Sequence, residues 1–123
     1  MFDRYRFPYS DFNKVNLDWV MKHLPCECEL TAADSDVVTL VNYNAVLFGE
    51  YVLADVHLYA PNPVSVNTAL FTLPYNAETS YQTSVYNSNA HLFVDSNTKT
   101  VYIDGAFSGH IYAKCLIKID RGY

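Results

Sequence analysis

Two stretches of this chain have an apolar side chain at every second position, and this period limits the possible folds more than any other feature. In residues 51–60 the positions from Val52 onward alternate between aliphatic residues and a set that includes Asp55 and His57. Residues 107–117 have the same period. Successive side chains of a β-strand point to opposite faces, so each stretch predicts a strand with one buried face. The predicted inward residues are Val52, Ala54, Val56 and Leu58 in the first strand and Phe107, Gly109, Ile111, Ala113, Cys115 and Ile117 in the second.

Six shorter segments are also typical of strands: residues 37–41, 45–48, 68–72, 81–86, 90–94 and 100–103. Residues that favour turns lie between them, at 42–44, 61–63, 87–89, 95–97 and 104–105. The segment from Asp95 to Lys99 is the strongest hairpin candidate. About eight strands at this spacing predict a mainly β protein, a β-sandwich or jelly roll.

The first 25 residues follow a different pattern. Aromatic residues recur every two or three positions from Phe2 to Phe12, and Pro8 disfavours a helix at Phe7, so residues 1–12 are expected to form an extended strap. A short α-helix should follow, with Trp19 on its apolar side, and should end before Pro25. Such a helix needs a partner surface. We therefore expect an anchoring segment at 1–25 and a β-sandwich domain at 26–123.

Composition and charge exclude several classes of protein. The 123 residues suffice for one domain, and half of them are hydrophobic. Between residues 25 and 97 there is no Lys or Arg but eight Asp and Glu, so neither nucleic acid nor an anionic membrane surface is an expected partner. The absence of a long apolar run predicts no membrane insertion, and the absence of a leader-like start, with three cysteines, predicts synthesis in a reducing cytoplasm.

Few residues suggest catalysis or metal binding. Cys26 and Cys28 are too closely spaced for a typical zinc site, and with Cys115 they are more simply interpreted as small hydrophobic residues, although a disulfide remains open. Asp55 and His57 share one strand face and could orient a general base, but no nucleophile motif accompanies them. The expectation is a protein without enzyme activity, cofactor or metal, with a small hydrolase as a minor alternative.

Nine of the eleven tyrosines lie between Tyr43 and Tyr123, which is more than one small core would bury. Tyrosine suits surfaces where the ring is dry and the hydroxyl is wet, which favours subunit interfaces first and sugar-stacking surfaces second. A set of aromatic and amide residues near predicted loops is the expected receptor or glycan contact: Tyr75, Asn76, Tyr86, Asn87 and Asn89.

Two motifs resemble parts of phage fibre proteins. Phe7-Pro8-Tyr9, Phe12-Asn13 and the V-N-L-D-W-V run of residues 15–20 resemble the F-P-Y … F … L-N-L-D-W segment that opens tail, collar or head fibre proteins in phages of Gram-positive, gut-type bacteria. Here Val15 stands in place of the leucine. Residues 67–74 (N-T-A-L-F-T-L-P), with the later strands, resemble the small C-terminal β domain of such fibres. Those fibres have a longer glycine-rich loop after L-P.

The resemblance implies a receptor-binding subunit of the virion. Its N-terminus would dock on other virion proteins of the capsid, collar or tail, and its β domain would form a homotrimer that meets a host-surface receptor such as a glycan. The implied anchor residues are Phe7, Pro8, Tyr9, Phe12, Leu17 and Trp19. The resemblance does not separate a head from a tail position. The alternative function is a freestanding carbohydrate-binding module. If His57 faced its copies across a three-fold axis, protonation near pH 6 would loosen the trimer.

Overall fold

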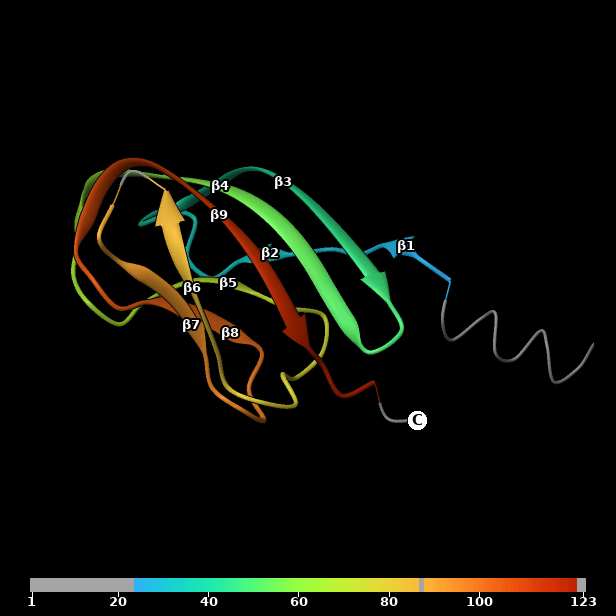
Figure 1. Cartoon of the computed structure of the whole chain (residues 1–123). Coiled ribbons are helices and arrows are strands. Elements are labelled where there is room, and N and C mark those ends of the chain that lie inside the picture. The colour runs from blue at the N-terminus through green and yellow to red at the C-terminus, as the bar shows by residue number, and fades with distance from the viewer. Residues whose placement is uncertain (1–23, 87, 122–123) are drawn as a thin grey trace, which may run out of the picture.

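The computed structural model describes residues 24–86 and 88–121, and within them it contains strands but no helix (Figure 1). The nine strands are β1 (Cys26–Glu27), β2 (Thr31–Ala32), β3 (Thr39–Phe48), β4 (Tyr51–Val64), β5 (Thr68–Thr72), β6 (Tyr81–Tyr86), β7 (His91–Val94), β8 (Thr100–Ile103) and β9 (Phe107–Lys118). The predicted mainly β fold is confirmed. The predicted strap and the predicted helix lie outside the described residues, and the proposed domain boundary remains a prediction.

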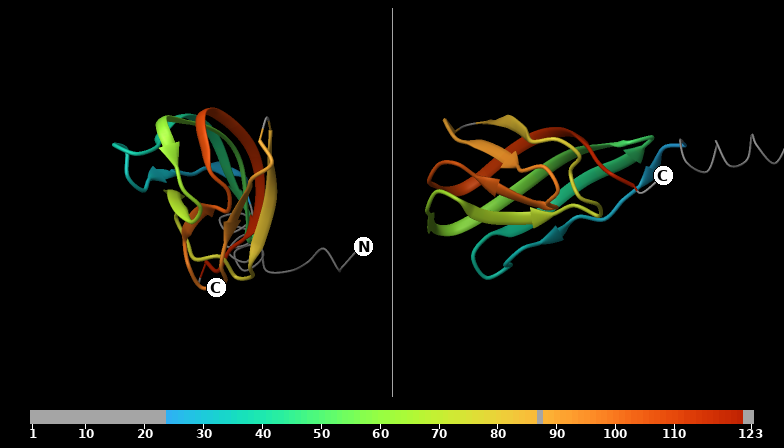
Figure 2. Two further views of the ribbon diagram at one scale, coloured as in Figure 1. Left: turned by 90° about the vertical axis from the view of Figure 1, so that its left-hand side faces the viewer. Right: turned by 90° about the horizontal axis from the view of Figure 1, so that it is seen from below.

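A single antiparallel sheet, folded over into two layers, makes up the described domain. Its strand order is β1-β3-β4-β9-β6-β7-β8-β5-β2. Strand β6 belongs to both layers, because Val85 and Tyr86 pair with β9 while the preceding residues of β6 pair with β7. Figure 2 shows the two layers facing each other, with β3, β4 and β9 on one side and β5, β7 and β8 on the other. The result is jelly-roll-like.

The core lies between the layers and follows the predicted period. In β4 the buried residues alternate with outward ones from Val52 to Ala60, and β9 does the same around Ile111 and Ile117. The opposite layer contributes Leu70, Phe71, Leu92, Val94, Val101 and Ile103. One predicted inward residue differs: Gly109 is only partly buried and has a φ of 80°, because it lies where the β4–β9 register is about to shift. Burial on one face is what selects this register.

Two predicted turns are wrong. Residues 42–44 lie inside β3, where they pair with His57, Val56 and Asp55 of β4, and a bulge near Val41 absorbs the irregularity. Residues 61–63 continue β4, at a register shift between Ala60 and Val64 where the ladder makes no demand on a proline N–H. Tertiary pairing therefore overrides local turn preference at both places. Strands β1 and β2, which have two residues each, were not predicted from the sequence.

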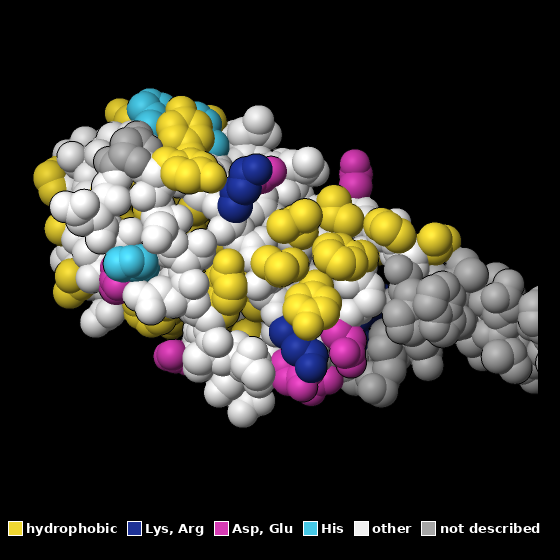
Figure 3. Space-filling model, viewed as in Figure 1, with side chains coloured by type: hydrophobic (Ala, Val, Ile, Leu, Met, Phe, Trp, Pro, Cys, Tyr) yellow, Lys and Arg dark blue, Asp and Glu magenta, His cyan; other side chains and the backbone are white. Residues whose placement is uncertain are grey.

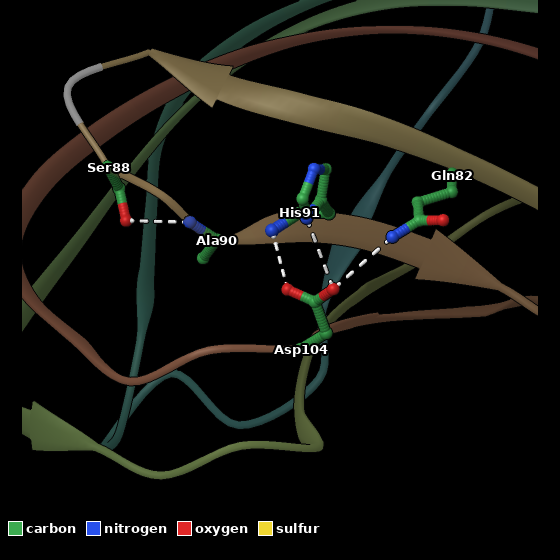
Figure 4. Close-up of polar contacts among 5 residues, drawn as sticks. All are labelled: Gln82, Ser88, Ala90, His91 and Asp104. Atoms are coloured by element: carbon green, nitrogen blue, oxygen red, sulfur yellow. Dashed lines mark hydrogen bonds and ion pairs between the residues drawn. The ribbon is translucent and has the colours of Figure 1, made fainter.

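The predicted turns at 95–97 and 104–105 are confirmed. Asn97 adopts a φ of 65°, and both the N–H and the hydroxyl of Thr98 donate to the carbonyl oxygen of Asp95, at 3.2 and 2.7 Å. In the other turn Asp104 accepts two hydrogen bonds (Figure 4), from the backbone N–H of His91 at 2.6 Å and from Nε2 of Gln82 at 3.3 Å, and its carboxylate lies 3.2 Å from Nδ1 of His91. This carboxylate joins β6, β7 and the turn that enters β9.

Candidate binding face

The outward side chains of β3, β4, β9 and β6 form one continuous exposed face. Because these strands lie side by side in fixed register, residues far apart in the sequence line up in rows across the sheet. Four neighbouring rows, each two residues further along the strands, are Phe48–Tyr51–Lys118, Val46–Leu53–Leu116, Asn44–Asp55–Lys114 and Asn42–His57–Tyr112–Tyr86. The first two rows are mainly apolar and the last two are polar and aromatic.

The first two rows form what we call the apolar patch: Val46, Phe48, Tyr51, Leu53 and Leu116. Leu53 and Leu116 lie opposite each other, and their exposed fractions are 45% and 46%. The rings of Phe48 and Tyr51 stack at 6.2 Å. Figure 3 shows hydrophobic side chains gathered over this end of the face. Large apolar side chains that remain in water and lie next to one another are typical of a protein-interaction site.

An ion pair lies on each side of the apolar patch. Lys118 Nζ is 3.5 Å from a carboxylate oxygen of Glu78, and Lys114 Nζ is 3.9 Å from one of Asp55. In Figure 3 a cationic side chain lies beside an acidic one at both places. An apolar centre with a charged rim is the usual anatomy of a protein interface.

The third and fourth rows enclose a shallow groove of about 590 Å³, which we call the tyrosine groove. The side chains that line it come from four strands: Asn42, Asn44, Asp55, His57, Tyr86, Tyr112 and Lys114. Tyr86 is 56% exposed and Tyr112 is 43% exposed. The groove therefore combines two aromatic rings in water with two amides, one imidazole and one ion pair.

A ladder of rings runs along one side of the groove. His57 stacks on Tyr112 with ring centroids 4.3 Å apart, and Tyr59 lies 4.5 Å from His110. The two pairs are joined by a hydrogen bond of 2.8 Å between Nε2 of His57 and Nδ1 of His110. This bond needs an unprotonated nitrogen on one of the rings, so protonation of both would remove it. The ladder fixes the orientation of the Tyr112 ring at the groove.

Comparison with known proteins finds no match. No protein-family model, curated protein or solved structure matches the chain.

The structure divides the predicted receptor residues between two ends of the domain. Tyr86 lines the tyrosine groove, Asn89 is exposed in the turn after β6, and Asn87 lies outside the described residues. Tyr75 packs against the core at the opposite end, with the Arg121 guanidinium 5.9 Å from its ring centre. Asn76 follows it and its carbonyl oxygen accepts from the N–H of Asp120. About 20 Å of β9 separates these two groups. The predicted anchor residues all lie outside the described part.

Four residues of the groove were not predicted as site residues from the sequence: Asn42, Asn44, Tyr112 and Lys114. The period of residues 107–117 does place Tyr112 and Lys114 on the outward face. Only the strand register brings them beside Tyr86 and the two asparagines. The sequence therefore indicates that these side chains point outward, but it does not show the long-range strand pairing that brings them together.

Asp55 and His57, the two residues considered for a hydrolase, each contact a different partner. Asp55 faces Lys114, and His57 bonds His110.

The described cysteines have free thiols. Burial raises the pKa of Cys115 to about 12, with a smaller contribution from Asp55. Partial burial, and then Cys26, raise the pKa of Cys28. Among residues 24–86 and 88–121, no three His, Cys, Asp or Glu side chains are grouped as a metal site would require. The described residues also contain no helix long and apolar enough to cross a membrane.

Proposed function

We propose that this chain is a structural subunit of a phage particle, whose β domain associates with copies of itself through the apolar patch and takes part in attachment to the host surface. The observation that carries the proposal is the apolar patch with its charged rim. The motifs of residues 7–20 and 67–74 resemble those of phage fibres, and this resemblance is the reason to expect a phage particle and a homotrimer. Residues 1–25 would be the segment that docks on other virion proteins, and the protein would reside in the virion.

A second copy of this chain is the partner that best fits the patch. The chain as a whole carries a formal net charge of −5. The two flanking ion pairs each place one cation beside one carboxylate, and Glu27 of β1, opposite Val46, adds one further carboxylate at the outer edge of the patch. At the two ion pairs, copies of an acidic protein can meet without bringing uncompensated charges of the same sign together.

The oligomeric state tests the assembly half of the proposal. Mass photometry or light scattering of the purified chain should give a mass three times that of the 14.0 kDa chain. Leu53→Asp places a carboxylate in the centre of the patch and should shift the protein to monomers, because a buried unpaired charge costs several kcal/mol. Val66→Asp is the matched control, since Val66 is 55% exposed in the turn between β4 and β5. A wild-type monomer would contradict self-association.

A separate experiment tests whether the chain is part of a phage particle. Mass spectrometry of purified, DNA-filled particles from an infected bacterium that encodes this chain should detect its peptides. A chain that lacks residues 1–25 should no longer co-purify with the particles, while its β domain stays soluble. Particles free of the full-length chain would rule out a virion subunit.

The tyrosine groove favours a second candidate, a freestanding carbohydrate-binding module. In that case the wild-type chain should be monomeric and Leu53→Asp should have no effect on its mass. The hydrolase alternative gains no support from the contacts of Asp55 and His57. A hydrolytic activity that alanine at either position abolishes would favour the hydrolase.

A further inference from the structure

We infer that the tyrosine groove binds a neutral carbohydrate chain, with pyranose rings lying against Tyr86 and Tyr112 and sugar hydroxyl groups meeting the amides of Asn42 and Asn44. This inference rests on the proposed role in attachment, because it names the class of host molecule that the subunit would contact. It places the contact on the face of the sheet and not in the loops around Tyr75 and Asn76.

The two tyrosines provide the apolar part of such a site. Tyr86 and Tyr112 are opposite each other on β6 and β9, and about half of each side chain is exposed. A pyranose ring has C–H groups on its faces, and these carry partial positive charge that suits the negative face of an aromatic ring. The stacked His57 limits the freedom of the Tyr112 ring, so less conformational entropy is lost on binding.

The polar residues fit the edge of a sugar. Each hydroxyl group of a pyranose both donates and accepts hydrogen bonds, and an asparagine amide offers both functions as well. Asn42 and Asn44 are exposed on β3, on the far side of the groove from Tyr86. The row from Asn42 to Tyr86 crosses four strands, a span of about 14 Å at the usual strand spacing. That length accommodates more than one linked ring.

Other classes of ligand fit less well. A peptide that adds to a sheet needs an unpaired strand edge, but β4 and β9 are paired on both sides beneath the groove. The outer edge of β3 is paired by β1 only at Val46 and Leu47, and a peptide added there would lie on the far side of β3 from Tyr86 and Tyr112. A polyanion, such as a nucleic acid or an acidic glycan, needs excess cations. Lys114, the cation of the groove, already lies 3.9 Å from a carboxylate oxygen of Asp55. A neutral, hydroxyl-rich ring is the chemistry that remains.

The groove and the apolar patch can act at the same time. The Asp55–Lys114 row separates the tyrosines of the groove from Leu53 and Leu116, so the side chains that would stack on sugar differ from those that would pack on a second copy. Several grooves on one assembly would bind together, and a weak single site would gain affinity through multivalency.

Titration of the full-length chain with neutral tetrasaccharides of glucose, galactose and N-acetylglucosamine tests the inference, by calorimetry and by NMR shifts. At least one sugar should bind saturably, and Tyr86→Ala and Tyr112→Ala should each weaken it about tenfold. Tyr102→Ala is the matched control, because Tyr102 lies on β8 in the opposite layer, outside both the groove and the apolar patch, and it should leave sugar affinity unchanged.

Three results would overturn the inference: no saturable binding of any of the three sugars, binding that both tyrosine variants retain in full, or tighter binding of a tetramer of galacturonic acid than of the neutral sugars. These results are distinct from failure of the proposed function. Wild-type monomers, or particles that lack the chain, would contradict the proposed function and leave the sugar site untouched. Trimers that attach to particles but bind no sugar would contradict the sugar site alone.

Discussion

Replacing Asp104 with alanine should destabilise the fold more than its partly exposed position would suggest. Its carboxylate accepts a hydrogen bond from the backbone N–H of His91, where β7 begins, at 2.6 Å. It also lies 3.2 Å from Nδ1 of His91 and accepts a hydrogen bond of 3.3 Å from Nε2 of Gln82. The adjacent N–H of Ala90 donates to Ser88 Oγ at 3.2 Å (Figure 4). The corner between β6 and β7, which follows Tyr86, thus depends on a carboxylate from the β8–β9 turn.

The magnitude follows from these three contacts of the Asp104 carboxylate. A hydrogen bond from a partly buried N–H to a charged acceptor contributes about 1.5–3 kcal/mol. The two side-chain contacts are solvent-exposed and contribute about 0.5 kcal/mol each. The sum predicts that Asp104→Ala lowers the free energy of unfolding by about 3 kcal/mol, and the melting temperature by about 10 °C for a chain of this size. Asp104→Asn keeps an acceptor but loses the charge, so it should cost about half as much.

Denaturant unfolding followed by circular dichroism is the appropriate assay. The midpoint should fall while the slope with denaturant stays constant, because the surface exposed on unfolding does not change. Asp36→Ala is the matched control, since Asp36 is an exposed aspartate in a loop and should shift stability by less than about 0.5 kcal/mol. A loss below about 1 kcal/mol for Asp104→Ala would refute the argument that this carboxylate holds the corner.

Two further predictions concern packing and pH. A Cβ on Gly105 would lie 2.9 Å from the Cβ of Ala90, so Gly105→Ala should cost about 1–3 kcal/mol and the added change Ala90→Gly should restore part of it; equal melting temperatures for Gly105→Ala and wild type would contradict this. Burial raises the pKa of Cys115 to about 12 from 9.0. Between these two pH values the folded chain keeps the thiol proton of Cys115, whereas the unfolded chain releases it. The associated stability is fully present below pH 9 and is lost as pH rises towards 12, by about 1.4 kcal/mol per pH unit. Unfolding free energies at about pH 8 and about pH 10 should show this loss in wild type but not in Cys115→Ala, and an equal loss in both would sink the assignment.

The sequence by itself determined which residues face the core. The period of two in residues 51–60 and 107–117 predicts the buried sides of β4 and β9, with Gly109 as the exception. Strands β5, β6 and β8 have the predicted bounds. These features are local, because a strand alternates its side chains whatever its partner is, and an apolar face must be buried wherever it lies.

Only the tertiary structure decided what the outward residues form. Residues 42–44 have turn chemistry but lie in β3, because pairing with β4 satisfies their backbone groups. Tyr86 and Tyr112 are 26 positions apart, and the β6–β9 register places them together. Tyr75, much closer to Tyr86 in sequence, packs at the other end of the domain. Register depends on the burial of whole faces and on backbone bonds between distant strands, and no short stretch of sequence contains that information.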